Sequence, residues 1–172
     1  RAPRPPGAVK TVVLGIGNPG RRDDGLGWAL VNEINRGQAP ISIDRKKGGR
    51  VRNSRELRTR PQFIQWKYQL NIEDAHAIKD ADLVVFADAA REGEAPATLA
   101  ELAPAAEISF STHALSPAAV LALAEELYGR APQAFLLAIR GYDFDLGEGL
   151  SPQAAANLEA ALALLADFLA SF

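Results

Sequence analysis

Hydrophobic positions along the chain follow two patterns. Short, nearly continuous apolar runs are typical of strands that are buried on both faces. Such runs cover residues 8–17, 83–86 and 134–139, and weaker strand candidates lie at 41–43 and 107–110. Between them, apolar residues recur three or four positions apart, which is the spacing of an amphipathic helix.

Start and stop signals place three helices on this spacing. A helix that begins near Leu26 is predicted to end before Gly37, because glycine often follows the last helical turn. Two more helices are predicted at Ser116-Pro117 and Ser151-Pro152, where a serine N-cap precedes a proline at the first helical position. Strands that alternate with helices predict one α/β domain over residues 1–172, with three layers and a twisted, mostly parallel or mixed sheet flanked by helices.

Composition and charge exclude several classes of protein. The chain has 172 residues, 48% of them hydrophobic, no cysteine and a formal charge of -2. The lack of cysteine excludes disulfides and Cys-bound metal, and the two histidines, His76 and His113, are too few for a three-histidine zinc site. The charge argues against nucleic acid or an anionic membrane as a partner. No apolar run approaches the roughly 18 residues of a membrane helix, and residues 1–6 lack the apolar core of a signal peptide, so we expect a cytoplasmic protein.

One segment departs from this charge balance. Nine Lys or Arg residues and two acids lie between Ile41 and Tyr68. We interpret residues 45–60 as a basic insertion that is solvated or disordered, and a loop that docks on an acidic patch of a partner is the alternative. The segment has no recognisable motif for reading nucleic acid. Trp66 and Tyr68, which follow it, are either anchors for a partner or strand residues.

Three polar residues follow predicted strands at the ends where open α/β sheets bind ligands. Asp24 comes a short loop after the strand 8–17, Asp88 ends a buried strand, and His113 follows the weaker candidate at 107–110. If these strands are parallel neighbours, two carboxylates and one imidazole meet at one edge. This set suits a divalent transition metal with open coordination positions, and it equally suits acid–base catalysis. The structural alternatives are a helix cap at Asp24, a turn at Asp88 and a loop position for His113.

Further acids and a histidine are weaker candidates. His76 lies in a polar helical stretch at 72–79, for which a solvated helix face is predicted. Asp143, Asp145 and Glu148 lie in a glycine-rich loop after the last predicted strand. We consider two interpretations of this loop. Its acids line the same edge of the sheet, or the loop is a solvated turn, and the solvated turn is favoured.

A glycine pattern supports a rival function. Gly15, Gly17 and Gly20 match the spacing of a dinucleotide-binding loop, and Asp44 stands roughly where an acid would bind the ribose. Pro19 argues against this site, because it removes a backbone donor near the position of the pyrophosphate. A tight turn is the simpler role for these glycines.

The string Gly15-Ile16-Gly17-Asn18, four further residues and Asp23-Asp24-Gly25-Leu26-Gly27 resembles the opening signature of the hydrogenase maturation proteases. These endopeptidases trim the C-terminus of nickel-iron hydrogenase large subunits. The resemblance continues, in order and spacing, through three later segments: Val85-Phe86-Ala87-Asp88-Ala89, Ser111-Thr112-His113 with Leu115-Ser116-Pro117, and Gly147-Glu148-Gly149-Leu150-Ser151. Together these segments span most of the chain.

This resemblance implies a metal-dependent endopeptidase with a three-layer fold of the phosphorylase/hydrolase type. It implies that Asp24, Asp88 and His113 hold nickel already loaded in the precursor, with no organic cofactor and no tightly bound metal of the enzyme's own. The expected partner is the hydrogenase large-subunit precursor, which is cleaved once. Because the chain has no cysteine and no Gly-x-Ser-x-Gly elbow, we expect attack by water that either the metal or one carboxylate activates.

The glycine string also resembles the start of the peptidyl-tRNA hydrolases, a family of related α/β architecture. That family continues with a Thr-Arg-His-Asn element, whereas this chain has Asp23-Asp24-Gly25-Leu26-Gly27 at the same place. The catalytic histidine of that family is therefore missing. A binding protein without activity is the last alternative.

Overall fold

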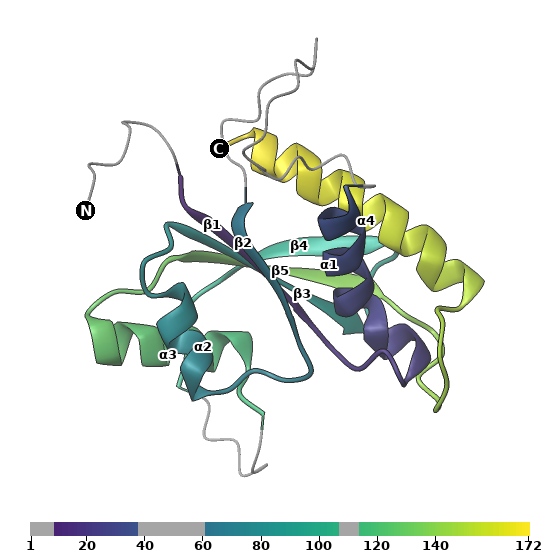
Figure 1. Ribbon diagram of the computed structural model, residues 1–172, viewed down its shortest axis with the longest axis horizontal. Helices are drawn as coiled ribbons and strands as arrows, with labels where there is room; N and C mark the ends of the chain where they lie inside the picture. The colour runs from purple at the N-terminus through teal and green to yellow at the C-terminus, as the bar shows by residue number, and fades with distance from the viewer. Residues whose placement is uncertain (1–8, 38–60, 107–113) are drawn as a thin grey trace.

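The computed structural model describes residues 9–37, 61–106 and 114–172. These residues form three layers, with a five-stranded sheet between two pairs of helices (Figure 1). The strands are β1 Thr11–Ile16, β2 Pro61–Lys67, β3 Leu83–Ala90, β4 Ala97–Leu102 and β5 Gln133–Arg140. The helices are α1 Leu26–Arg36, α2 Ile72–Ile78, α3 Pro117–Tyr128 and α4 Pro152–Ala170, and the 3-10 turn η1 Arg22–Gly25 precedes α1. The predicted α/β fold class, with a mixed sheet flanked by helices, is confirmed.

The order of the strands creates a switch point in the middle of the sheet. The order is β2-β1-β3-β5-β4. Strand β1 pairs in parallel with β2 on one side and β3 on the other, β3 pairs in parallel with β5, and β4 runs antiparallel at the edge. The chain therefore goes from β1 to one side of the sheet and then crosses to the other. The carboxyl ends of β1 and β3 flank the reversal, which is the place where open α/β sheets bind ligands.

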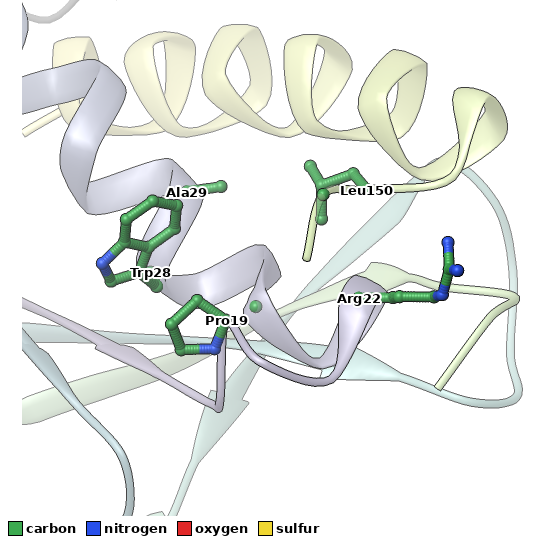
Figure 2. A pocket seen from close by; sticks show the side chains of 7 residues that line it. Pro19, Arg22, Trp28, Ala29 and Leu150 are labelled. Carbon is green, nitrogen blue, oxygen red and sulfur yellow. The ribbon is translucent and has the colours of Figure 1, made fainter. Parts of the chain in front are cut away.

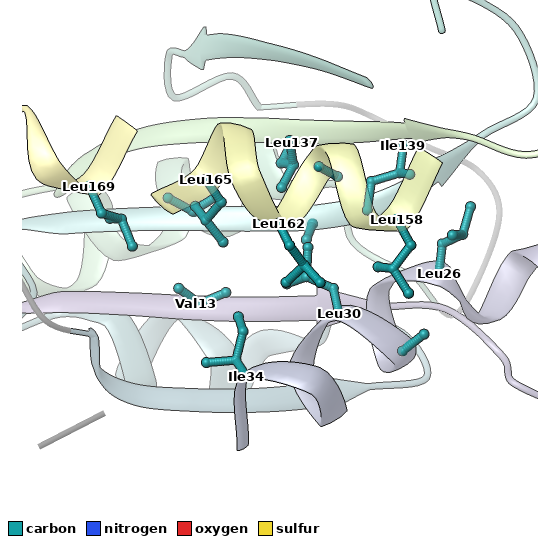
Figure 3. Close-up of a cluster of buried hydrophobic side chains, with 14 of the residues drawn as sticks. Val13, Leu26, Leu30, Ile34, Leu137, Ile139, Leu158, Leu162, Leu165 and Leu169 are labelled. Carbon is teal, nitrogen blue, oxygen red and sulfur yellow. The ribbon is translucent and has the colours of Figure 1, made fainter. Parts of the chain in front are cut away.

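Successive strand residues fill two apolar cores, one on each face of the sheet. Helices α1 and α4 cover one face, and α2 and α3 cover the other (Figure 1). Figure 3 shows the first core, which includes Val13, Leu30, Ile34, Leu137, Ile139, Leu158, Leu162 and Leu165. The second core includes Leu14, Val84, Phe86, Val120 and Leu121. The central strands are apolar at nearly every position because both faces are covered, and each fully buried side chain of this kind stabilises the fold by roughly 1.5–3 kcal/mol.

The helix ends agree with the predicted signals. Gly37 after α1 and Gly129 after α3 have φ values of 72° and 73°, in the left-handed region that favours glycine. The hydroxyl oxygens of Ser116 and Ser151 accept hydrogen bonds from the backbone N–H three residues later, at 3.1 and 3.2 Å. Both serines therefore act as N-caps of α3 and α4.

Two strands do not follow from the apolar pattern. Strands β2 and β4 lie at the two edges of the sheet, and both are largely half-exposed, so their sequences lack a continuous apolar run. Trp66 lies in β2, which makes it a strand residue. Strand β3 continues to Ala90, so Asp88 lies within the strand. The strand candidates at 41–43 and 107–110 and the basic insertion at 45–60 lie outside the described residues.

Helix α4 is long and apolar enough to cross a membrane, with a mean hydropathy of 1.2. The prediction that no segment approaches this length is therefore wrong by the criteria of length and composition. One side of α4 packs on the sheet through Leu158, Leu162, Leu165 and Leu169. Such packing on one side is the arrangement of an amphipathic core helix.

Candidate active site

Close backbone packing shapes the loop between β1 and α1. A Cβ atom on Gly27 would lie 2.6 Å from the carbonyl oxygen of Ala87 in β3, so α1 begins directly against the ends of β1 and β3. Gly17 has a φ of 133°, which residues with side chains rarely adopt, and a Cβ there would collide with the carbonyl oxygen of Asp24. The loop and η1 are therefore folded tightly over the carboxyl end of β1.

Asp24 lies in η1 and is partly exposed. Its Oδ2 atom accepts a hydrogen bond from the backbone N–H of Asn18 at 3.1 Å, and this bond fixes the Asp24 carboxylate against the backbone of the same loop. The predicted alternative of a helix cap at Asp24 is wrong, because the N-cap of α1 is Gly25 and no side chain caps that end. The indole of Trp66 in β2 donates to the carbonyl oxygen of Gly17 at 3.0 Å and ties the loop to the neighbouring strand.

Asp88 reaches the same end of the sheet from β3. Its neighbours Phe86 and Ala87 belong to the α2/α3 core and the α1/α4 core respectively, so the alternation of the strand directs Asp88 to the α2/α3 side. Burial raises the pKa of Asp88 to about 7; the backbone N–H of Ala89, which donates to its Oδ1 at 2.8 Å, opposes this rise, and the charge of Asp24 adds to it. The 3-10 turn η1, which carries Asp24, contacts β3, so the two carboxylates come from adjoining elements.

The raised pKa of Asp88 bears on the chemistry of the pair. Both residues are half-buried, and burial raises the pKa of the Asp88 carboxyl group to about 7. Groups with perturbed pKa values at a switch point of the sheet are typical of functional sites. The pair can bind a divalent cation between two oxygens, or hold a proton for acid–base chemistry.

His113, the third predicted member of the site, lies outside the described residues. Leu115, two positions later in the sequence, donates its backbone N–H to the carbonyl oxygen of Leu70 at 3.1 Å. In the parts of the chain that the structure describes, no three Asp, Glu, His or Cys side chains converge as a metal site. The role of His113 therefore stays a prediction.

Asp23 is a buried carboxylate that the pattern of strand ends does not single out. Its Oδ2 atom accepts hydrogen bonds from the backbone N–H groups of Tyr142 and Asp143 at 2.8 and 2.9 Å and from the Ser151 hydroxyl at 2.7 Å. Its Oδ1 atom accepts from the Ser151 N–H at 2.7 Å. Burial alone would raise the pKa of Asp23, but these hydrogen bonds hold it below its ordinary value. The acid doublet Asp23-Asp24 is the only signal in the sequence, and it does not say which acid is buried.

The weaker candidates lie on α2 and on the loop that follows β5. His76 is exposed on α2, and its Nδ1 lies 3.1 Å from the Tyr128 hydroxyl. Asp143 forms an ion pair with Arg22 at 3.4 Å, and Asp145 and Glu148 are exposed.

The glycines of the dinucleotide pattern contribute to close packing. A Cβ on Gly15 would collide with the carbonyl oxygen of Gly27, and Gly17 packs against Asp24. Asp44, the proposed ribose ligand, lies outside the described residues.

No protein-family model and no curated protein matches the sequence. Solved structures do match it over nearly the whole chain. The [NiFe] hydrogenase maturation protease HycI from Thermococcus kodakarensis is 21% identical with a TM-score of 0.62, and the match covers 94% of this chain and 92% of that chain. The hydrogenase maturating endopeptidase HybD from E. coli is 20% identical with a TM-score of 0.64, covering 95% and 93%. The hydrogenase 2 maturation peptidase from a Thaumarchaeota archaeon is 18% identical with a TM-score of 0.61, covering 93% and 97%.

At these identities the likeness concerns the fold, and it agrees with the resemblance found in the sequence motifs. The structure thus places Asp24 and Asp88 at the switch point of a known architecture. The chain has the fold of the hydrogenase maturation peptidases.

Proposed function

We propose that this chain is a hydrogenase maturation endopeptidase, which acts in the cytoplasm and removes a C-terminal peptide from the nickel-loaded precursor of a nickel-iron hydrogenase large subunit. The observation that carries the proposal is the pair Asp24 and Asp88 at the switch point between β1 and β3. The sequence motifs around both residues and the shared fold support the same function.

In this proposal the nickel belongs to the substrate. Asp24, Asp88 and His113 bind the nickel of the docked precursor, and this contact positions the scissile peptide. Two carboxylates and one imidazole suit a divalent transition metal and leave coordination positions open for ligands from the precursor. Nickel binding requires a deprotonated Asp88, so the proton of this carboxyl group is released as the precursor docks.

Hydrolysis then proceeds by attack of water on the carbonyl carbon of the scissile peptide. The C–N bond breaks, the new C-terminus keeps the water oxygen, and the leaving nitrogen takes a proton. Either the nickel or one of the two carboxylates activates the water.

The experiment compares nickel-loaded and nickel-free large-subunit precursors from the same organism. Each is incubated with the purified protein, and the products are followed by intact mass. We expect loss of a C-terminal peptide from the loaded precursor alone. Equal cleavage of both forms contradicts the role of nickel, and intact precursors in every pairing contradict the function.

A matched pair of variants tests the site. Asp88→Asn keeps the size of the side chain and the acceptor for the Ala89 N–H. We expect it to lower kcat by roughly a hundredfold or more, the usual effect of losing a group that acts in proton transfer or metal binding. Glu126→Gln, which neutralises an exposed acid on α3, is the control and keeps full activity. Full processing by Asp88→Asn contradicts the assignment.

A further inference from the structure

Lys67 and Asp74 form an ion pair that the proposed reaction does not use. Lys67 is the last residue of β2, and Asp74 lies in the first turn of α2. The Lys67 Nζ atom lies 3.1 Å from Oδ1 of Asp74, whose side chain is completely buried. The other oxygen of Asp74, Oδ2, accepts a hydrogen bond from the backbone N–H of Asn71 at 2.8 Å. The carboxylate is therefore fixed from two directions, and it holds the lysine side chain in one place.

A buried ion pair contributes little net stability. Taking two charges out of water costs free energy, and an apolar pair of similar size often stabilises a fold as well or better. Lys67 also remains accessible, since 24% of its side chain is exposed. An ammonium group has three N–H donors, and among the described residues Asp74 is the only ion-pair partner of Lys67. Donors are therefore left over for a ligand that approaches from solvent.

The register of the sheet places Lys67 level with Asp88. Lys67 is paired with Ile16 of β1. On the other side of β1, Gly15 is paired with Ala87 of β3. One residue further along these two parallel strands, Ile16 lies level with Asp88. Neighbouring strands are about 4.8 Å apart, so the Cα atoms of Lys67 and Asp88 are about 10 Å apart across β1.

Both side chains project from the α2/α3 face of the sheet. Ile64 of β2 packs against the α1/α4 core, so Lys67, three positions later, points to the opposite face, where it meets Asp74. Ile16 belongs to the α2/α3 core and is 9% exposed, so its side chain lies on this face between Lys67 and Asp88. The two charged groups therefore flank an apolar side chain. An apolar surface of this kind lowers the local dielectric and strengthens electrostatic contacts with a group bound over it.

The loop that carries Asp24 is tied to the same lysine. The carbonyl oxygen of Lys67 accepts a hydrogen bond from the backbone N–H of Gly17 at 3.0 Å. The next backbone N–H, that of Asn18, donates to the Asp24 carboxylate at 3.1 Å. Lys67 and Asp24 are therefore bound to successive residues of one loop. Together with Asp88, these charged residues lie around the carboxyl end of β1.

The opposite side of this loop has different chemistry. Figure 2 shows a small hollow there, which is lined mainly by apolar residues: Pro19, Trp28, Ala29 and Leu150. Trp28 and Ala29 pack in the α1/α4 core, so the hollow lies on the side of the sheet away from Asp88. Its charged lining residue, Arg22, pairs with Asp143 at 3.4 Å. Lys67, by contrast, shares a face of the sheet with Asp88.

We propose that Lys67 is a substrate-binding residue of this site, whose ammonium group donates a hydrogen bond to the carbonyl oxygen of the scissile peptide. The proposal rests on the proposed function, because the substrate is the peptide that Asp24 and Asp88 process. When water attacks the carbonyl carbon, the π electrons of the C=O bond move onto this oxygen, and they re-form that bond as the C–N bond breaks. Lys67 keeps its proton and stabilises the negative charge on the oxygen between these two steps. Because Asp74 already holds the ammonium group in place, the donor needs no reorganisation.

A double variant removes the ammonium group without leaving a buried charge unpaired. Lys67→Met combined with Asp74→Asn replaces both side chains by neutral ones of similar size, and the new amide oxygen can still accept the Asn71 N–H. Asp74→Asn alone keeps the ammonium group and tests what the ion pair contributes. Lys79→Met is the control, because α2 leads back to the start of β3 and Lys79 after it lies at the opposite end of the sheet. Thermal unfolding establishes that each variant is folded before activity is measured.

The readouts are kcat and KM for cleavage of the nickel-loaded precursor, and the rise in melting temperature that Ni²⁺ causes. We expect the double variant to lower kcat about a hundredfold or more, the usual effect of removing a donor to a developing oxyanion, while KM changes less than about threefold. The rise caused by Ni²⁺ is retained, because Lys67 is not a nickel ligand. Asp74→Asn alone lowers kcat less than the double variant, since the donor is still present. Lys79→Met leaves every readout unchanged.

The outcomes separate the role of Lys67 from the function. If the wild-type protein cleaves the precursor and the folded double variant keeps its kcat, the ion pair is structural only, and the function stands without this role. If Asp74→Asn alone lowers kcat as much as the double variant does, or if the double variant also loses the rise caused by Ni²⁺, the pair acts through the shape of the site and the role of Lys67 is overturned. If the wild-type protein cleaves no precursor, the function is overturned and the role of Lys67 with it.

Discussion

Among single residues, Asp88 is expected to have the largest effect on how the stability of the protein depends on pH. Because burial raises its pKa from 3.8 to about 7, the folded protein binds a proton over this pH range that the unfolded chain has released. Stability is therefore expected to fall as the pH rises from about 4 to about 7. Asp88→Asn removes this dependence and increases the free energy of unfolding at pH 8 by at most about 4 kcal/mol. Chemical denaturation at pH 5 and pH 8 measures it.

The control for this prediction is Asp145→Asn, which neutralises an exposed acid at the same end of the sheet. It should leave the pH dependence of stability as in the wild-type protein. If Asp88→Asn has the same stability as wild type at both pH values, Asp88 is solvated and its pKa is ordinary.

Asp23 is expected to change stability with pH in the opposite direction. Hydrogen bonds hold its pKa below 3.8, so its contribution to stability is present above this pH and is lost as the pH falls further. In Asp23→Asn the amide NH2 must face at least one N–H donor, because both carboxylate oxygens accept backbone hydrogen bonds. We expect a loss of roughly 2–4 kcal/mol in the free energy of unfolding at pH 7.

Urea denaturation measures this loss, and limited proteolysis reports whether the loop at 141–150 is released. Because Asp23 precedes Asp24, the variant also tests whether the loop positions the candidate site. A stability within about 0.5 kcal/mol of wild type, the range of ordinary surface changes, would show that the hydrogen bonds to the Asp23 carboxylate contribute little to stability.

The start of α1 gives the prediction at the scale of elements. A Cβ on Gly27 would lie 2.6 Å from the Ala87 carbonyl oxygen, and rigid backbone on both sides prevents relief. Gly27→Ala is expected to lower the free energy of unfolding by about 3 kcal/mol or more, the upper range for overpacking. Gly20→Ala is the matched control, because its Cβ meets only the Asn18 side chain, at 3.2 Å, and its expected change is within about 1 kcal/mol.

Thermal and urea unfolding of the two alanine variants compare these glycines directly. Equal stabilities would mean that α1 shifts away from the sheet at little cost. The helix would then not be a fixed platform for Asp24.

Elements with strong local signals could be predicted from the sequence, and edge elements could not. Strand β3 is apolar on both faces, and α3 and α4 carry a serine N-cap followed by proline, so local physics identifies them. Strand β4 has neither signal, because it is a half-exposed edge strand that depends on pairing with β5. Asp24 and Asp88 were predictable as polar residues near strand ends. The hydrogen bonds that hold the loop at 141–150 to Asp23 could not be predicted, since the partners lie about 120 residues away in sequence.

At the scale of the whole molecule, the switch point divides the sheet into two parts that meet between β1 and β3. One carboxylate of the candidate site comes from each part, Asp24 from the loop after β1 and Asp88 from β3. A cation that binds to both carboxylates links the two parts of the sheet. Such a cation binds to the folded chain and not to the unfolded chain. Added Ni²⁺ should therefore raise the melting temperature by mass action, even without a precursor.

This stabilisation by Ni²⁺ is expected to depend on pH, because the cation competes with the proton on Asp88. At pH 6 most Asp88 is protonated, and at pH 8 it is charged, so the shift in melting temperature should be larger at pH 8. His113→Gln separates the two titrations: a pH dependence that remains in this variant comes from Asp88. In Asp88→Ala the Ni²⁺-induced shift should be lost at both pH values. If the shift in the wild-type protein is equal at pH 6 and pH 8, or if it survives in Asp88→Ala, then Ni²⁺ binds elsewhere. The switch point is then not the nickel site.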